Sequence, residues 1–421
     1  MQYALVDCNW FYASVEMLFR PWLRTKAVVV ASNNDGCVVS RNDLAKALGI
    51  KMGTPVFELR DLVQRGELHL FSSNYEVYQS ISNRVMAVLD ELSPRLSVFS
   101  IDEAFADLSG LHNPHDWGVQ ARDTIQQRLG MPVGVGIAPT LTLAKMANWA
   151  AKRWKAKTGC VVDMLDADRR EKLLRYAPVG EVWGIGARIS QRLREDLRIE
   201  TAWQLATADP KLLRRQFSVN VEKTARELSG MPCFPFGSSG PERKQVIACT
   251  RSFGTRVTTL EGLQGAVAAF MGTASAKLRR QGSMTHCVQV FAHASPYASA
   301  PPYSRSVIVQ LPTPCADARN LTSAAIGALE AIYRPGVAFA KAGVILSQFC
   351  NAEGWTGDLF APAPRPGSAA VMKVMDAINA KQGRGAIRLA RDSGRGPWVM
   401  QRQHLSPGYT TSWSGLPQAQ A

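Results

Sequence analysis

Hydrophobic and polar positions follow two different periods along the first 165 residues. Short apolar runs such as YALVDC and PVGVGIA are typical of buried strands, whereas YEVYQSISNRVMAVLDEL and LTLAKMANWAAKRWKA repeat apolar residues at helical spacing. AVVVASNNDGCVVS predicts two strands joined by an Asn-Asp-Gly turn, and Asn42 is placed to cap a short helix that ends at Gly49. We therefore predict an α+β layer with helices against one face of a sheet.

The pattern changes after this first region. Residues 166–235 carry short helical repeats, and residues 236–245 are rich in Gly, Pro and Ser, as is typical of an interdomain linker. Residues 246–350 mix the strand runs HCVQVFAHA, SRSVIVQL and KAGVILSQF with two helical segments. We predict a multidomain chain with domains at 1–165, 166–235 and 246–350 and an extension at 351–421.

Composition and charge narrow the class of protein. The 421 residues are 46% hydrophobic and 20% charged, the profile of a soluble globular protein, and no run of about 18 apolar residues predicts a membrane span. The amino end lacks a basic leader and carries Asp7 and Glu16, so we do not expect a secretory signal. Eight scattered cysteines without a CxxC pair favour free thiols in a reducing cytoplasm over a zinc ribbon or a disulfide framework.

The net charge of +15 indicates a polyanionic partner, because phosphate contacts release counterions and supply much of the affinity. Nucleic acid is the first candidate and an anionic membrane surface is the second. A basic protein that is only kept soluble by its charge is the remaining alternative.

Two adjacent acids interrupt the apolar stretch SVFSIDEAFADL. Burying Asp102 and Glu103 without a positive partner would cost much free energy. Side chains alternate along a strand, so only a turn between LSVFSI and AFADL would bring both acids to one edge. Asp7 ends the first apolar strand of the same domain, and three carboxylates at one sheet edge suit Mg²⁺ and two-metal phosphoryl chemistry. The alternative is an ordinary strand end whose acids face water.

Two further features indicate contacts with phosphate. Lys145 and Lys152 lie seven residues apart on one helix face, in a stretch without acids from 141 to 162; the alternative is a solvated surface. VWGIGARISQRL fits a helix–hairpin–helix, in which Gly184 and Gly186 allow a tight turn and the next helix presents backbone N–H groups to a DNA phosphate. The alternative for this motif is a simple turn.

Five stretches in sequence order resemble the motifs of Y-family translesion DNA polymerases: LVDCNWFYASVE, SNNDGCVVSRNDLAKALGIKMG, FSSNYEVYQSISNRVM, SIDEAF and VGVGIAPTLTLAKMANWAAK. The tail stretches RPGSAAVMKVMDAINAKQGRG and LSPGYTT resemble the extension of the UmuC-type catalytic subunit of DNA polymerase V. The resemblance implies a right-hand polymerase architecture: a palm at 1–165 with small fingers at about 20–75, a helical thumb at 166–235, an α/β little finger at 246–350, and a partner-binding extension at 351–421.

The resemblance also implies roles for individual residues. It assigns Asp7, Asp102 and Glu103 as catalytic acids that hold two Mg²⁺ ions, with the backbone carbonyl of Cys8 as a further ligand. The matching nucleotide and DNA positions are Phe11 and Tyr12 under the nucleotide, Ser40, Lys46 and Lys152 at the triphosphate, and Gly184, Gly186, Arg188, Arg251, Arg256, Lys277 and Arg279 at the DNA. The ring of Tyr12 matches the steric gate, which would clash with a 2′-hydroxyl.

Two positions depart from the family pattern. Asp43 stands three residues before Lys46, where the family usually carries a tyrosine, and its role stays open. Leu359 and Phe360 keep only the end of a sliding-clamp motif of the form Gln-Leu-x-Leu-Phe, so clamp binding is a weaker expectation.

We therefore predict an error-prone translesion DNA polymerase that adds dNTPs to a primer on template DNA, in DNA damage tolerance and SOS mutagenesis. The resemblance implies a processed UmuD-like dimer and RecA as partners, no membrane, and a bacterial cytoplasmic location at the nucleoid. Two alternatives remain: a palm-domain nucleotidyl cyclase, which needs no thumb for gripping DNA, and a non-catalytic DNA-binding protein with a retained fold. Retention of the three acids, Tyr12 and Lys152 disfavours the second.

Overall fold

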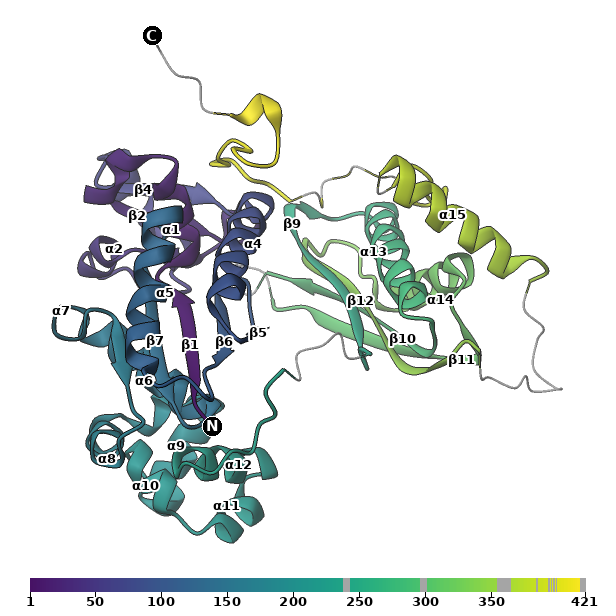
Figure 1. Cartoon of the computed structure of the whole chain (residues 1–421). Coiled ribbons are helices and arrows are strands. Elements are labelled where there is room, and N and C mark those ends of the chain that lie inside the picture. Colours follow the sequence, from purple (N-terminus) through teal and green to yellow (C-terminus); the bar gives the residue numbers. More distant parts are fainter. Residues whose placement is uncertain are drawn as a thin grey trace. The chain divides into compact units, whose positions relative to one another are not determined.

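The computed structural model describes residues 1–237, 243–295, 301–353, 365–383, 385–392, 394, 396, 398 and 400–416 (Figure 1). Contacts divide the chain into two compact units. Unit 1 comprises Met1–Ser32, Gly36–Pro241 and His404–Ala421, and unit 2 comprises Asn33–Asp35 and Glu242–Gln403. The segment that begins at His404 thus belongs with the amino-terminal unit. Among the described residues, no helix is long and apolar enough to cross a membrane.

Unit 1 is built around a five-stranded sheet in the order β5-β6-β1-β7-β8. β1 lies at its centre, antiparallel to β6 and β7, and is apolar on both faces. Ala4 and Val6 pack with α1, α4 and α5 on one face, whereas Tyr3 and Leu5 pack with α6 and the short helices after residue 166 on the other. The strands are β1 (Tyr3–Cys8), β5 (Arg95–Val98), β6 (Glu103–Asp107), β7 (Val133–Ala138) and β8 (Val161–Asp163).

The sequence-based prediction of helices on one face of this sheet was therefore wrong. A strand whose successive residues are all apolar has to be covered on both faces, because its side chains alternate between them. The helices that cover this sheet are α1 (Phe11–Leu18), α4 (Tyr75–Leu92), α5 (Pro114–Leu129) and α6 (Leu141–Arg153). A short helix, α7 (Lys155–Thr158), follows α6.

A smaller sheet in the order β3-β2-β4 forms the region predicted as fingers. The predicted hairpin is confirmed, since β2 and β3 pair antiparallel, and β4 adds to β2 in parallel. The predicted cap is also confirmed: Asn42 Oδ1 accepts the Ala45 N–H at 3.0 Å, and the helix ends before Gly49 at φ +79°. The elements are η1 (Pro21–Thr25), β2 (Ala27–Ala31), η2 (Asn33–Asp35), β3 (Val38–Arg41), α2 (Asp43–Ala47), η3 (Val56–Leu59), α3 (Arg60–Gln64) and β4 (Leu68–Ser72).

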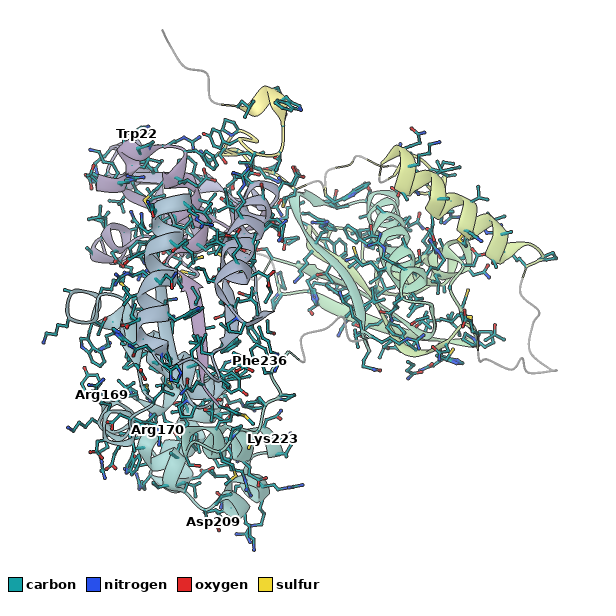
Figure 2. The ribbon with its side chains drawn as sticks, in the orientation of Figure 1. Trp22, Arg169, Arg170, Asp209, Lys223 and Phe236 are labelled. Atoms are coloured by element: carbon teal, nitrogen blue, oxygen red, sulfur yellow. The ribbon has the colours of Figure 1, made fainter. Side chains whose placement is uncertain are left out.

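The region predicted as a thumb is helical, as its pattern indicated. Figure 2 marks Arg169, Arg170 and Lys223 on these short helices, and Asp209 at the start of one of them. The chain then returns toward the sheet, where Phe236 stacks on Tyr3 with ring centroids 5.6 Å apart. The helices are α8 (Ala167–Tyr176), η4 (Val179–Glu181), α9 (Ala187–Leu197), α10 (Ala202–Thr207), α11 (Pro210–Gln216) and α12 (Val219–Leu228).

Unit 2 is a four-stranded antiparallel sheet in the order β11-β10-β12-β9, with α13 and α14 against its apolar face. The strand β9 was not singled out from the sequence, because arginines and threonines interrupt its apolar positions along an edge of the sheet. The elements are β9 (Ile247–Val257), α13 (Leu260–Arg280), β10 (Ser283–Ala294), β11 (Ser304–Cys315), α14 (Ala318–Ile332) and β12 (Phe339–Asn351).

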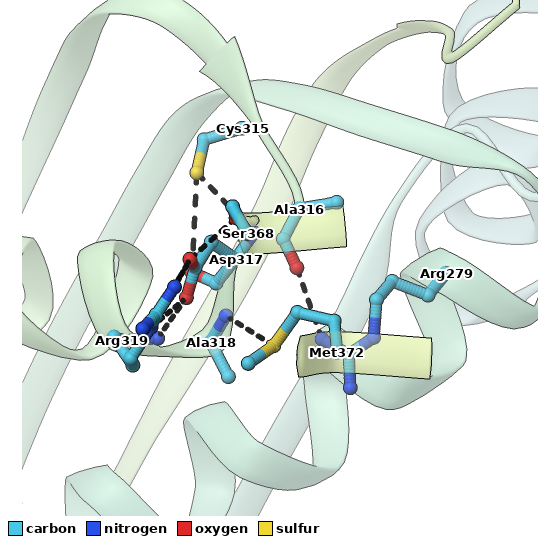
Figure 3. Close-up of polar contacts among 8 residues, drawn as sticks. All are labelled: Arg279, Cys315, Ala316, Asp317, Ala318, Arg319, Ser368 and Met372. Carbon is cyan, nitrogen blue, oxygen red and sulfur yellow. Dashed lines mark hydrogen bonds and ion pairs between the residues drawn. The ribbon is translucent and has the colours of Figure 1, made fainter. Parts of the chain in front are cut away.

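The carboxyl-terminal helix α15 (Ser368–Gln382) is anchored on unit 2 by polar contacts (Figure 3). Arg279 donates to both carboxylate oxygens of Asp376, each at 2.7 Å. The Ser368 hydroxyl donates at 2.6 Å to Asp317, which is the residue that caps α14. Although burial raises the pKa of Asp317, hydrogen bonds from Arg319 and Ser368 lower it to about 2. This carboxylate therefore stays charged at neutral pH and joins α15 to α14. A last short turn, η5, spans Trp413–Gly415 in unit 1.

Candidate active site

The two adjacent acids lie where the chain turns sharply between β5 and β6. β6 begins at Glu103, so Asp102 is in the turn itself. Ser100 Oγ accepts the backbone N–H groups of Asp102 and Glu103 at 3.3 and 3.2 Å, and its hydroxyl donates to the Asp102 carboxylate. The turn that the sequence analysis required is therefore present, and it brings both acids to one edge of the sheet.

Asp7 reaches the same edge from the neighbouring strand. It stands directly opposite Glu103 in the β1–β6 register. The Cys8 N–H donates to the Asp102 carbonyl at 2.8 Å, which ties the end of β1 to the turn. Strand pairing thus brings Asp7 to the adjacent acids Asp102 and Glu103, from which it is distant in sequence.

Two lysines of α6 neutralise this edge. Lys145 Nζ lies 2.9 Å from Glu103 Oε1, and Lys152 Nζ contacts Asp7 Oδ1. Lys145 also lies over the rings of Phe99 and Trp183, with its ammonium 4.4 and 4.9 Å from their centroids. The sequence predicted that both lysines share a helix face; that they pair with the acids follows only from the packing of α6 against β1 and β7.

Burial has the largest effect on the pKa of Asp7. Burial raises the pKa of Asp7 to about 6; Lys152 opposes the rise, and Asp102 and Glu103 add to it by repulsion. Burial likewise raises the pKa of the Cys8 thiol, which stays neutral. The backbone carbonyl is therefore the group through which Cys8 could act as a metal ligand.

The donor set fits a hard divalent cation, although the side chains are not gathered around one. Among the described residues, no group of three or more His, Cys, Asp and Glu is arranged to hold a metal ion. Each acid is instead turned toward a partner within the chain, because Asp7 and Glu103 pair with lysines and Asp102 accepts from Ser100. Three carboxylates and a carbonyl are nevertheless the oxygen ligands that Mg²⁺ prefers, and an ion could replace the two ammonium groups.

An aromatic stack adjoins the acids at the start of α1. The ring of Tyr12 stacks on Tyr78 with centroids 4.6 Å apart and planes 16° apart, and Tyr75 meets it edge-on at 5.9 Å. Phe11 is buried in the core, whereas Tyr12 is half-buried. Phe11 therefore packs in the core, and Tyr12 keeps one exposed side on which a ligand could lie.

The region predicted as fingers carries the other predicted phosphate contacts. Ser40 Oγ accepts the Ala13 N–H and donates to the Trp10 carbonyl, both at 3.2 Å, so it fixes the start of α1. Lys46 Nζ pairs with Asp43 at 3.1 Å. Ser40 and Lys46 thus have partners within the chain in this structure.

Asp43, whose role the sequence left open, joins two elements. Lys155 Nζ of α7 lies 2.7 Å from Asp43 and 3.9 Å from the centroid of the Trp10 ring. Although burial raises the pKa of Asp43, hydrogen bonds from Lys155 and Lys46 hold it below its ordinary value. Asp43 therefore gathers two ammonium groups at one place. Sequence analysis missed Lys155, for which only the general excess of basic residues was a signal.

The predicted DNA contacts fall into two groups, one in each unit. In unit 1, Gly184 has φ +85° and Gly186 stands at the N-cap of α9, which carries Arg188, so the tight turn of the hairpin is present. In unit 2, Arg251 and Arg256 lie on β9 and Lys277 in the last turns of α13. Arg279 is engaged with Asp376, so a phosphate contact there would have to replace this ion pair. Leu359 and Phe360 lie outside the described residues.

Comparison with known proteins identifies three matching regions. The impB/mucB/samB family matches residues 6–149, its C-terminal domain matches residues 244–359, and a domain of unknown function matches residues 369–419. The three acids, Tyr12 and Lys145 all lie in the first match.

Relatives extend over nearly the whole chain. Protein UmuC of Salmonella typhimurium is 44% identical over 98% of this chain and 99% of its own length, and protein MucB of Escherichia coli is 42% identical over 99% of each. DNA polymerase IV 1 of Halalkalibacterium halodurans is 34% identical over 51% of each. A solved Y-family DNA polymerase chimera matches 83% of this chain and 100% of its own, with a TM-score of 0.63 at 18% identity, which indicates a shared fold.

Proposed function

The chain belongs to the impB/mucB/samB family, and from this membership we infer that it is an error-prone translesion DNA polymerase. The observation that carries the inference is the convergence of Asp7, Asp102 and Glu103 at adjoining strand ends within residues 6–149. A polymerase needs acids at such a sheet edge because nucleotidyl transfer requires metal ions beside the substrate phosphates.

We assign the metal site to Asp7, Asp102, Glu103 and the carbonyl of Cys8, and we propose that this site binds two Mg²⁺ ions. Two ions bound there would stabilise the attacking primer 3′-hydroxyl and the leaving pyrophosphate oxygen. The chain's own part is to hold the acids rigid, which the β1–β6 register and the Ser100 turn do.

The lysines of the site have two partners in this proposal. Lys145 and Lys152 neutralise Glu103 and Asp7 in the free protein. A metal ion held by these acids would take over that neutralisation and leave the ammonium groups free for the triphosphate. Lys152 then contacts the triphosphate, as does Lys46 with Ser40 from the fingers. Lys155, which Asp43 holds beside Lys46, adds a further cation at this place. Fixed ammonium groups favour the charge that develops on the leaving pyrophosphate.

Replacing Lys152 with Ala is expected to raise the KM for dNTP about tenfold and to lower kcat less, because one ammonium–phosphate contact is lost. Steady-state single-nucleotide insertion at saturating Mg²⁺ measures this. Lys157→Ala, which removes an exposed ammonium group on α7, is the matched control and should leave KM unchanged. An unchanged KM in Lys152→Ala would remove this residue from the triphosphate site.

The partners are also proposals. Primer-template DNA would lie against the hairpin of Gly184, Gly186 and Arg188 and against the basic residues of unit 2, Arg251, Arg256 and Lys277. We propose the processed UmuD-like dimer and RecA as protein partners, with the sliding clamp at Leu359 and Phe360, and action at the bacterial nucleoid. The limits of palm, fingers, thumb and little finger are proposals that rest on the sequence.

Primer extension across an abasic template, with Mg²⁺, four dNTPs and the UmuD-like and RecA partners, tests the proposed function. We expect extension past the abasic site that depends on the template. Cyclic nucleotide formation from a triphosphate without DNA would favour the cyclase alternative. DNA binding without extension under any combination of partners would favour the non-catalytic alternative.

A further inference from the structure

The carboxyl-terminal segment His404–Tyr409 docks on unit 1 through a set of specific hydrogen bonds. The His404 N–H donates to Ser72 Oγ and the Ser72 N–H to the His404 carbonyl, each at 2.9 Å, at the end of β4. Asn74, at the start of α4, donates its amide to the carbonyl and the hydroxyl of Ser406, both at 3.0 Å. One backbone bond, at Ser72, and the side chains of Ser72 and Asn74 therefore hold the segment on unit 1.

Aromatic contacts hold the end of the same segment. The ring of Tyr409 stacks on Phe19 with centroids 4.3 Å apart and planes 14° apart. The Arg20 guanidinium lies 5.4 Å from the centroid of the Tyr409 ring and 4.7 Å from that of Phe71. Ser406 and Tyr409 are both buried. The contact is thus packed at Ser406 and Tyr409, whereas His404, Leu405 and Pro407 between and before them are exposed.

The segment reaches a buried carboxylate on α1. Glu16 is 1% exposed, and its Oε1 accepts the hydroxyls of Tyr78 at 2.8 Å and Ser406 at 2.9 Å. Its Oε2 pairs with Arg20 at 2.9 Å. Burial raises the pKa of Glu16, and these three donors oppose the rise. A buried carboxylate with this number of donors is held firmly in place, because losing one donor leaves part of its desolvation uncompensated.

Tyr78 connects this carboxylate to the gate residue. Tyr78 is fully buried on α4, and its ring is the one on which Tyr12 stacks at 4.6 Å. The hydrogen bond to Glu16 fixes the Tyr78 hydroxyl and so opposes sliding of its ring within the stack. A chain of contacts thus runs from Ser406 through Glu16 and Tyr78 to Tyr12.

We propose that the segment His404–Tyr409 is a positioning element for sugar selection, which acts through Glu16 and Tyr78 on the ring of Tyr12. The inference rests on the proposed function, in which Tyr12 excludes the 2′-hydroxyl. A gate excludes a single oxygen atom, so a small displacement of its ring changes the clash. Ser406, Glu16 and Tyr78 touch no substrate in this proposal and act only by holding Tyr12 where the clash occurs.

The test compares full-length Ser406→Ala and Tyr78→Phe with the parent. The ratio of kcat/KM for a deoxynucleotide to that for the matching ribonucleotide is measured on one template. Each variant is expected to lower this ratio about fivefold, the equivalent of one hydrogen bond, mainly by raising ribonucleotide insertion. Because both hydroxyls bind Glu16 Oε1, the double variant should lower the ratio by less than the product of the single effects.

Two variants serve as controls. Ser406→Thr keeps the hydroxyl and should keep the parent ratio. Ser414→Ala removes an exposed hydroxyl just after the segment, whose partner is Ser412, and should also keep the parent ratio. Thermal unfolding of each variant accompanies the kinetics, so that a loss of fold is separated from a change in selection.

Three results would overturn the inference and leave the proposed gate role of Tyr12 standing. The first is an unchanged ratio in both Ser406→Ala and Tyr78→Phe while Tyr12→Ala admits ribonucleotides; the proposed function would then stand without it. The second is an equal loss with both sugars, which would reduce the segment to general support. The third is a changed ratio in Tyr78→Phe alone, which would remove the carboxyl-terminal segment from sugar selection. An unchanged ratio in Tyr12→Ala would reject the gate and the inference together.

Discussion

Replacing Asp102 with Asn is expected to abolish templated primer extension, with a loss in kcat/KM of at least about 1000-fold. Asn has the same shape and can still bond to the Ser100 hydroxyl, so the turn between β5 and β6 is retained. What the substitution removes is one of three negative charges at the sheet edge, and a hard divalent cation depends on such charges for its affinity. Single-nucleotide insertion with Mg²⁺ measures the loss.

A matched control for this variant lies on the same strand. Asp107 is at the opposite end of β6, where its carboxylate pairs with Arg95 at 3.2 Å. Asp107→Asn removes the same charge from the same sheet but away from the acids and should leave extension within about twofold of the parent. Equal extension by the parent and Asp102→Asn would reject the metal-dependent mechanism. Binding of primer-template DNA by Asp102→Asn should persist, which separates a catalytic loss from a folding loss.

Replacing Tyr12 with Ala is expected to admit ribonucleotides, lowering the preference for deoxynucleotides about 100-fold, or about 2.7 kcal/mol. The half-buried ring of Tyr12, supported beneath by Tyr78, is a flat obstacle whose removal leaves room for a 2′-hydroxyl. The ratio of kcat/KM for the two sugars opposite one template base measures the change.

Tyr12→Phe is the matched control, because it retains the ring and removes only the hydroxyl. We expect it to keep most of the preference for deoxynucleotides. The same preference in Tyr12→Ala as in the parent would remove Tyr12 from the gate role. A loss of insertion with both sugars, without a change in their ratio, would indicate that Tyr12 supports the nucleotide but does not select its sugar.

Much of the fold could be predicted from hydrophobic periodicity. The finger hairpin, the Asn42 cap, the long helix at Tyr75–Leu92 and the helical region after residue 166 are confirmed. These features are local, since each depends on residues close together in the sequence. The strand β9 was missed because it is an edge strand, where half of the side chains face water and arginines are tolerated.

The candidate site was predictable in part for the same reason. Asp102 and Glu103 stood out because charge inside an apolar run demands an explanation. The pairing of Glu103 with Lys145, and that of Asp43 with Lys155, could not be predicted, because each pair joins elements far apart in sequence. An exposed lysine and a lysine that neutralises a buried acid look alike in a sequence.

By itself, the sequence determined the elements, the ordered motifs that mark the family, and the three acids and the gate tyrosine as candidates. Only the tertiary structure decided that the central sheet is covered on both faces, that the lysines of α6 meet the acids, and that Ser406 bonds to Glu16 across 390 positions of the chain. The physical reason is that periodicity reports which face of an element is apolar, whereas the partner of that face is selected by packing among all elements together.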